Sequence, residues 1–231
     1  MAKLWVKTLN VSSNPSGAAS AARSGNIVVV VDVIDMSTTA EAALEAGVID
    51  VLGASPDNSN LPVTVNPEKI AYFAGKKALK YDTEVVVAAE PRYIKLLEDY
   101  KNISQVKKGI ERAGSRICDI LPNIGKETVE LVNLENKILL IVSSSGGAVF
   151  DAAFNYGAPE VITGTIARTT NMKGVEPAKK AAERAIKYAS RHRSGISIIA
   201  ASSNSIEDVL AAEFISKEIL KNGFLNIDES D

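Results

Sequence analysis

Uninterrupted apolar runs alternate along this chain with amphipathic or alanine-rich stretches, and short polar segments separate them. Apolar runs without alternating polar positions are typical of strands buried on both faces, and they predict strands at 4–9, 27–33, 48–52, 84–88, 138–142, 161–163 and 196–200. The stretches between them have helical periodicity and predict helices at 15–23, 39–46, 67–79, 104–113, 148–156, 177–192 and 206–222.

This alternation predicts an α/β fold with a mixed or mostly parallel sheet flanked by helices on both faces. We expect two α/β halves packed together, residues 1–113 and 138–231, with 114–137 as the connection. No internal repeat stands out in the sequence. Right-handed crossovers would place the carboxyl ends of parallel strands at one edge of the sheet, where α/β folds bind ligands. The polar segments that follow the strands are therefore the candidates for a site.

The composition narrows the class of protein. The 231 residues are 46% hydrophobic and 23% charged, and the net charge of −2 comes without a basic block, so we expect no nucleic-acid partner. Cys118 is the single cysteine, which excludes an internal disulfide and a cysteine-rich metal site. No apolar segment approaches the roughly 20 residues of a membrane span, and the first residues lack the apolar core of a signal peptide. We therefore expect a cytoplasmic protein with no membrane partner.

The strongest chemical signal lies where an apolar run ends at Asp32 and the following helix begins near Ser37, Thr38 and Thr39. Backbone N–H groups at a helix N-terminus and hydroxyl donors beside them can bind a phosphate, with Asp32 as a ligand for Mg²⁺. The alternative is structural, because Ser and Thr are preferred helix N-caps and Asp32 could be a hydrogen-bonded residue at a strand end. In isolation the sequence favours neither interpretation.

A second junction of the same kind joins the run 138–142 to the next predicted helix, with the sequence Ser143-Ser144-Ser145-Gly146-Gly147. Two glycines allow successive N–H groups to point at one anion, although a flexible turn has the same composition. The chain contains no Gly-Lys-Ser/Thr phosphate loop. Two hydroxyl-rich junctions in one α/β chain favour an anion site more than one does.

Charged residues follow two further strands. Glu90 and Arg92 come after the run 84–88, where Arg92 could bind a phosphate or sulfonate through two hydrogen bonds or form a surface ion pair. Glu207 and Asp208 open the last predicted helix, where Ser205 and Asp208 also resemble a capping box. We take Asp32, Glu90 and Asp208 as candidate catalytic carboxylates, and Arg92 and Glu207 as candidate substrate contacts.

The order of these segments resembles the 2-phosphosulfolactate phosphatase family of coenzyme M biosynthesis. The family's opening motif, Asp-Val-Leu-Arg-Ala-Ser-Thr-Thr after a strand, is similar to residues 32–39, Asp-Val-Ile-Asp-Met-Ser-Thr-Thr. Four further family segments are matched loosely and in order: Gly-Glu-Arg by residues 89–92, Gly-Asn-Ser-Pro by 122–125, Thr-Thr-Asn-Gly-Thr by 143–147, and Glu-Asp by 207–208. The resemblance covers nearly the whole chain.

The resemblance implies an α/β fold, Mg²⁺ dependence and hydrolysis of a phosphate ester next to a sulfonate. With the residues above, it makes these the candidate substrate-binding positions: Ser37, Thr38, Arg92, Asn123, Ser143, Ser144, Ser145, Gly146 and Glu207. The chain departs from the family at Asp35, where the family has Arg, at Pro91, and at Ser145 and Gly147. Asp35 adds a negative charge beside the predicted anion site, which weakens binding of a dianion unless a cation offsets it.

The sequence therefore predicts a Mg²⁺-dependent phosphatase of a small phosphorylated acid, 2-phosphosulfolactate or a related phosphate monoester. A non-catalytic relative that binds an anionic metabolite is the alternative, and a scaffold without a small-molecule site is a third. Attack on phosphorus by Asp32 and attack by water are both compatible with the sequence. The alanine-rich stretch 177–189 could pack a homodimer or serve the core of a single chain.

Overall fold

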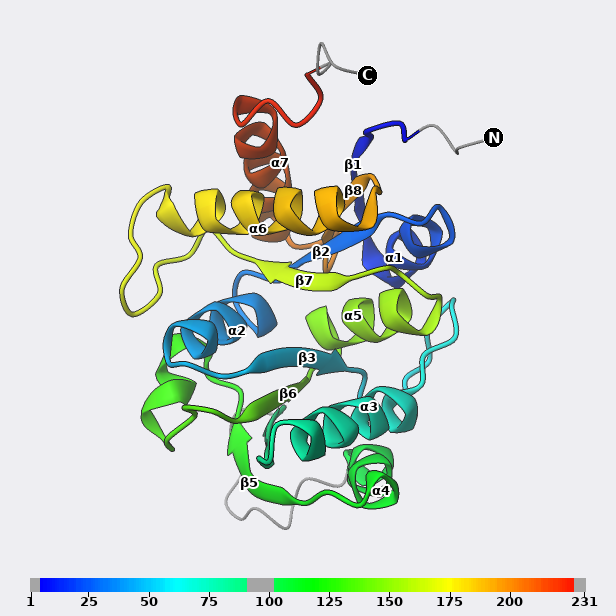
Figure 1. Ribbon diagram of the computed structural model, residues 1–231, viewed down its shortest axis with the longest axis vertical. Coiled ribbons are helices and arrows are strands. Elements are labelled where there is room, and N and C mark those ends of the chain that lie inside the picture. Colours follow the sequence, from blue (N-terminus) through cyan, green and yellow to red (C-terminus); the bar gives the residue numbers. More distant parts are fainter. Residues whose placement is uncertain (1–4, 91–101, 227–231) are drawn as a thin grey trace.

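The structure, a computed structural model, describes residues 5–90 and 102–226, in which strands and helices alternate (Figure 1). The strands are β1 (Leu9–Ser13), β2 (Ile27–Val31), β3 (Asp50–Ala54), β4 (Val85–Ala89), β5 (Ile117–Pro122), β6 (Ile138–Val142), β7 (Val161–Gly164) and β8 (Ile196–Ala200). The helices are α1 (Asn14–Arg23), α2 (Met36–Glu45), α3 (Pro67–Lys80), α4 (Ser104–Ala113), α5 (Gly146–Asn155), α6 (Glu176–His192) and α7 (Ile206–Lys221), with a 3-10 helix η2 (Gly125–Glu130).

In the described residues the strands form two four-stranded sheets, and every pairing is parallel. Sheet A has the order β1-β8-β2-β7, and sheet B has the order β3-β6-β4-β5. The apolar runs IVVVV of β2 and ILLIV of β6 suit this arrangement, because a central parallel strand is buried on both faces. The predicted α/β fold of two packed parts is confirmed, with two parallel sheets where one was expected.

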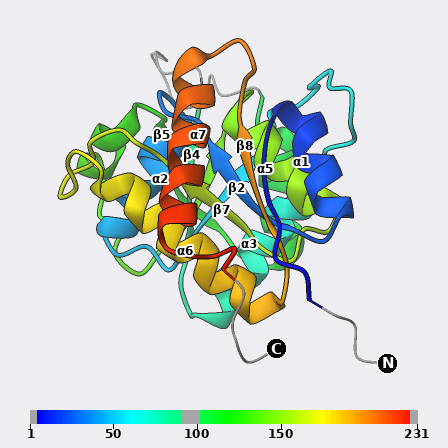
Figure 2. The same ribbon diagram turned by 90° about the horizontal axis from the view of Figure 1, so that it is seen from above.

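Helices cover both faces of each sheet (Figures 1 and 2). Between the two sheets lie α2 and α5, with α1 beside α5. The outer face of sheet A is covered by α6 and α7, whereas α3 and α4 pack together on the outer side of sheet B. Successive residues of β2 point to opposite sides, so Val28 and Val30 join the core between the sheets and Val29 joins the core under α6 and α7.

The two sheets are related by an internal two-fold pseudosymmetry, which corrects the expectation that the chain has no repeat. The succession β1-α1-β2-α2-β3-α3-β4-α4 recurs as β5-η2-β6-α5-β7-α6-β8-α7. When each strand of sheet A is replaced by its counterpart, its order becomes β5-β4-β6-β3, which is sheet B read backwards. Each repeat therefore contributes two strands to each sheet.

The correspondence extends to strand register and to turns. The last residues of the sheet A strands, Ser13, Ala200, Val31 and Gly164, lie in one row, as do their counterparts Pro122, Ala89, Val142 and Ala54 in sheet B. After α2 and α5 the chain turns at Gly47 and Gly157, with φ of 86° and 82°. The sequences that follow, GVIDVLGAS and GAPEVITGT, align without a gap. The repeat is thus visible in sequence only once the fold shows where to align it.

Most predicted elements lie where the sequence indicates, but two edge strands differ. Residues 5–8 are not strand, and the first strand is Leu9–Ser13, whose polar sequence LNVSS contains no apolar run. β5 has no counterpart among the predicted strands, because its sequence ICDILP is partly exposed at the edge of sheet B. It lies within 114–137, the segment expected to be a connection. Since each sheet takes strands from both sides of that segment, the sequence halves do not correspond to the sheets.

The alanine-rich face of α6 packs inside the chain. Ala178, Ala181, Ala182, Ala185 and Ala189 are all buried in the core against sheet A. This is the second of the two uses expected for that face, and the homodimer stays a prediction. In the parts of the chain that the structure describes, no helix combines the length and apolarity needed to cross a membrane.

Candidate functional site

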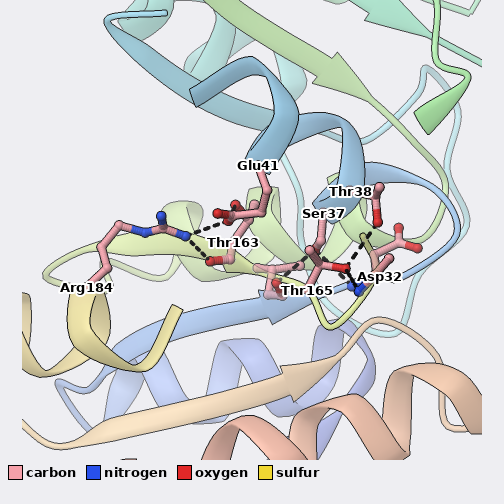
Figure 3. A network of polar contacts seen from close by, with 9 residues as sticks. Asp32, Ser37, Thr38, Glu41, Thr163, Thr165 and Arg184 are labelled. Carbon is pink, nitrogen blue, oxygen red and sulfur yellow. Dashed lines mark hydrogen bonds and ion pairs between the residues drawn. The ribbon is translucent and has the colours of Figure 1, made fainter. Parts of the chain in front are cut away.

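The junction between β2 and α2 is closed by its own hydrogen bonds (Figure 3). Asp32 is only 3% exposed, and its backbone N–H donates to Ser37 Oγ at 2.9 Å. The Ser37 hydroxyl donates to the Val30 carbonyl at 3.0 Å, and the Ser37 N–H donates to the Asp32 carbonyl at 2.9 Å. The single hydroxyl hydrogen of Ser37 is therefore engaged within the protein. Ser37 is not a helix cap, however, because α2 begins at Met36 and its N-cap is Asp35, without a side-chain capping hydrogen bond.

Thr38 is engaged in the same way. Its hydroxyl donates to the Val33 carbonyl at 2.5 Å and lies 3.1 Å from the hydroxyl oxygen of Thr165, on the segment after β7 (Figure 3). Ser37 and Thr38 therefore fasten the start of α2 to sheet A. A bound phosphate could receive their hydroxyl hydrogens only if these bonds opened.

The two predicted junctions meet at Asp32. Its Oδ2 accepts the Gly146 N–H at 2.7 Å and the Ser145 hydroxyl at 2.8 Å, both at the start of α5. A Cβ at position 146 would lie 2.4 Å from this oxygen, so the approach requires glycine. The N-terminus of α5 carries a partial positive charge and here binds a carboxylate of the same chain. At the predicted anion site of the second junction, the anion that binds in this structure is Asp32.

Two further carboxylates flank Asp32 and face equivalent backbone N–H groups of the two repeats, although Glu90 directly follows β4 and Asp208 lies in α7. Asp208 Oδ1 accepts the Val33 N–H at 2.8 Å, and Glu90 faces the backbone N–H of Ser144. Val33 and Ser144 are each the second residue after a central strand, β2 and β6. Each junction is therefore supplied with one carboxylate from the chain that follows the neighbouring strand, β8 or β4.

Burial and mutual repulsion change the acidity of these carboxyl groups. Burial raises the pKa of Asp208 to about 6, and the charge of Asp32 raises it as well. Burial also raises the pKa of Glu90, with a smaller contribution from Asp32, whereas the Asn123 amide and the Ser144 N–H lower it. A carboxyl group whose pKa lies closer to neutrality can hold or release a proton near physiological pH. Of the two, Glu90 is the less completely buried.

Asn123 links Glu90 to α2. This fully buried residue follows β5, its Nδ2 donates to Glu90 Oε1 at 3.2 Å, and its Oδ1 accepts the Thr39 hydroxyl at 2.6 Å. The Asn123 N–H extends the sheet by donating to the Ala89 carbonyl at 3.0 Å. Both ends of the Asn123 amide therefore have partners inside the protein.

A second pair of buried carboxylates holds the two middle helices in place. Glu41 of α2 accepts the Thr163 hydroxyl at 2.8 Å and pairs with Arg184 of α6 (Figure 3). At the equivalent position of α5, Asp151 accepts the Ser55 hydroxyl at 2.7 Å and the Asn66 N–H at 2.8 Å. The helices that begin at the candidate site are thus each tied to the end of a strand or to the residue just after it.

Most of the predicted site residues gather at this place: Asp32, Ser37, Thr38, Glu90, Asn123, Ser143, Ser144, Ser145, Gly146 and Asp208. Glu207 is half-buried beside Asp208, and its charge acts on the Asp208 carboxyl. Arg92 lies outside the described residues. Thr39, which the sequence indicates as a hydroxyl donor together with Ser37 and Thr38, also joins the network. Thr165 joins it without a signal in the sequence, because its contact with Thr38 is made across the fold.

The carboxylates of the site are the residues that could hold the predicted Mg²⁺ ion. Among residues 5–90 and 102–226, no three His, Cys, Asp or Glu side chains stand close enough together to hold a metal ion. Asp32 Oδ2 already accepts two hydrogen bonds. These side chains do not fit a Mg²⁺ ion held by protein ligands alone. Mg²⁺ dependence stays a prediction.

No protein-family model matches this chain, and a search of curated proteins finds no match.

Proposed function

We propose that this protein hydrolyses a phosphate monoester of a small acid, 2-phosphosulfolactate or a related compound. One observation supports the proposal: the segments that resemble the family's motifs converge on Asp32. The hydrogen bond between Val33 and Asp208 joins positions 175 residues apart, and that between Gly146 and Asp32 joins positions 114 apart. Residues that belong to an ordered series of motifs and also lie side by side in the fold support a common site more strongly than any one motif does.

Roles follow from accessibility and charge. Ser144 is exposed, so its hydroxyl group would contact a phosphoryl oxygen, whereas the hydroxyl hydrogen of the half-buried Ser145 is already donated to Asp32. Hydrolysis forms a P–O bond to water and breaks the ester P–O bond. Water loses one proton and the leaving oxygen gains one, and Glu90 would carry this proton because its pKa is raised. Asp32 would set the geometry, since it ties the start of α5 to the end of β2.

The test is a phosphate-release screen over small phosphate monoesters that includes 2-phosphosulfolactate. Asp32→Asn is expected to lower turnover at least about 100-fold, because the neutral amide cannot replace the charged bonds to Gly146 and Ser145. Asp119→Asn, an exposed position on β5, is the matched control and should keep full turnover. Unchanged turnover in Asp32→Asn would remove Asp32 from the mechanism, and no release by the unaltered protein from any ester would refute the proposal.

The Mg²⁺ requirement is tested separately in the same assay. Turnover is compared after treatment with EDTA, with excess Mg²⁺ restored, and with neither. Loss on chelation and recovery with Mg²⁺ is the expected result. Full activity in EDTA would contradict Mg²⁺ dependence while leaving the hydrolase proposal intact.

A non-catalytic relative that binds an anionic metabolite is the second candidate. It is favoured by the position of Asp32, whose carboxylate already binds the N-terminus of α5. In that case no ester is hydrolysed, but a bound metabolite raises the melting temperature, since a ligand at 100 times its Kd stabilises by about 2.7 kcal/mol. A thermal-shift series with the same esters therefore separates the two candidates.

A further inference from the structure

The two repeats place an asparagine at the same point, directly after an edge strand. Asn123 follows β5 and Asn14 follows β1. β5 ends in register with β4, and β1 ends in register with β8, the counterpart of β4. Asn14 meets an uncharged loop, donating to Ser203 Oγ at 3.1 Å and accepting the Ser203 N–H at 3.1 Å. Only in the second repeat does the asparagine meet a carboxylate, Glu90. Asn14 therefore serves as an internal comparison for Asn123, because it has the equivalent position without the hydrogen bond to Glu90.

The orientation of the Asn123 amide follows from its neighbours. An ionised carboxylate accepts hydrogen bonds and cannot donate them, so Nδ2 faces Glu90 and Oδ1 faces Thr39. The hydroxyl of Thr39, a residue of α2, lies 2.6 Å from Oδ1 and 3.0 Å from the Gly125 carbonyl at the start of η2, so Thr39 connects α2 to the segment after β5. The chain Thr39–Asn123–Glu90 therefore connects the buried face of α2 to the most accessible of the three carboxylates.

We propose that Asn123 is a positioning residue of this site, which holds the Glu90 carboxylate in a fixed orientation and transmits the position of α2 to it. Asn123 does so from a fully buried place and with a geometry that leaves its amide a single choice of partners. The kinetic consequence of this inference rests on the proposed hydrolase function, whereas the link between Asn123 and Glu90 does not.

The groups that face Glu90 decide what a change at Asn123 does. The Asn123 amide and the Ser143 and Ser144 donors stabilise the ionised carboxylate, and the charge of Asp32 opposes it. Asn123→Asp keeps the shape of the side chain but puts an acceptor and a negative charge where a donor was. Two carboxylates in contact cannot both ionise easily.

The experiment compares Asn123→Asp with Asn14→Asp, the same substitution at the equivalent position of the other repeat. The titration midpoint of the Glu90 carboxyl carbon is followed by ¹³C NMR, with its signal assigned by its loss in Glu90→Gln. Asn123→Asp is expected to raise the midpoint by about one pH unit or more, and Asn14→Asp to leave it unchanged. An unchanged midpoint in Asn123→Asp overturns the inference.

Thr39→Val provides a second arm that removes the anchor of the amide without adding charge, and it decides the question where Asn123→Asp does not fold. A smaller upward shift of the Glu90 midpoint is expected, and no shift overturns the inference. In the phosphate-release assay both variants should lower kcat with little change in KM. An unaltered protein that releases no phosphate refutes the proposed function only. A protein that releases phosphate but shows neither shift in its variants refutes the inference only.

Discussion

The raised pKa of Asp208 should make the free energy of unfolding depend on pH. Its pKa rises from 3.8 to about 6 on folding, so the folded protein binds this proton more tightly than the unfolded chain. Stability contributed by the proton is fully present below the unfolded pKa of 3.8 and is lost as the pH rises through about 6. At 1.36 kcal/mol per pKa unit, the shift of about 2 units corresponds to a loss of up to about 3 kcal/mol.

Asp208→Asn should therefore stabilise the protein at pH 8 and have no such effect at pH 4. The asparagine oxygen can still accept the Val33 N–H, so the structural contact is kept. We expect a gain of about 1–2 kcal/mol in the free energy of unfolding at pH 8, measured by urea denaturation. Asp119→Asn, on the exposed side of β5, should show no comparable pH dependence. A gain that is equal at both pH values would contradict the assignment.

Ser37 offers a second test at the scale of one residue. Ser37→Ala removes the acceptor of the buried Asp32 N–H and the donor to the Val30 carbonyl. We expect a loss of about 1–3 kcal/mol in the free energy of unfolding, as for other buried groups left without a partner. Ser16→Ala on the exposed face of α1 is the control. A variant as stable as the unaltered protein would show that these bonds do not close the junction.

At the scale of elements, the sequence predicts what is apolar and continuous. β6, β8 and α4 occur as predicted, because a central strand or a strongly amphipathic helix carries its own signal. β1 and β5 lie at sheet edges, where exposed polar residues such as Asn10 and Asp119 interrupt the pattern. For the site, the sequence predicts which residues lie at the junctions between strands and helices. It does not predict that the Gly146 N–H binds Asp32, because this contact joins residues far apart in the chain and no local pattern encodes it.

The contact between the start of α5 and the end of β2 has a direct test. Gly146→Ala would place a Cβ 2.4 Å from Asp32 Oδ2 and 2.8 Å from Met36 Cβ, so one of the two junctions must move. We expect a loss of about 2–4 kcal/mol in the free energy of unfolding, as for overpacked cores. Gly174→Ala, at a turn with φ of 60° and nothing near its Cβ, should cost only about 1 kcal/mol. Equal losses of stability in Gly146→Ala and Gly174→Ala would contradict the close approach of the Gly146 backbone to Asp32 Oδ2.

At the scale of the whole molecule, the two sheets share one hydrophobic core. The core between them includes Val28 of sheet A, Ile141 of sheet B, and Phe150 of α5. Sheet B is formed by the consecutive strands β3 to β6, and sheet A by β1, β2, β7 and β8 on either side of them, so the shared core rather than the chain path couples the two sheets. The protein should therefore unfold as one cooperative unit.

Two natural probes report on the sheets separately. Trp5 packs against the core on the outer side of sheet A, and Cys118, the single cysteine, is half-buried on β5 of sheet B. We expect Trp5 fluorescence and the reactivity of the Cys118 thiol to change at the same urea concentration. Midpoints separated by about 1 M or more would show that the sheets unfold independently.

Asp32 and Ser143 directly follow the equivalent strands β2 and β6, and this relationship bears on how such a protein could arise. A polypeptide of half this length could complete both sheets only by exchanging its last two strands with a second copy of itself. The present chain has the form that such a strand-swapped pair would take after its genes were joined head to tail. In such a joined chain the two junctions could diverge independently, so that an acidic side chain follows β2 where a hydroxyl side chain follows β6.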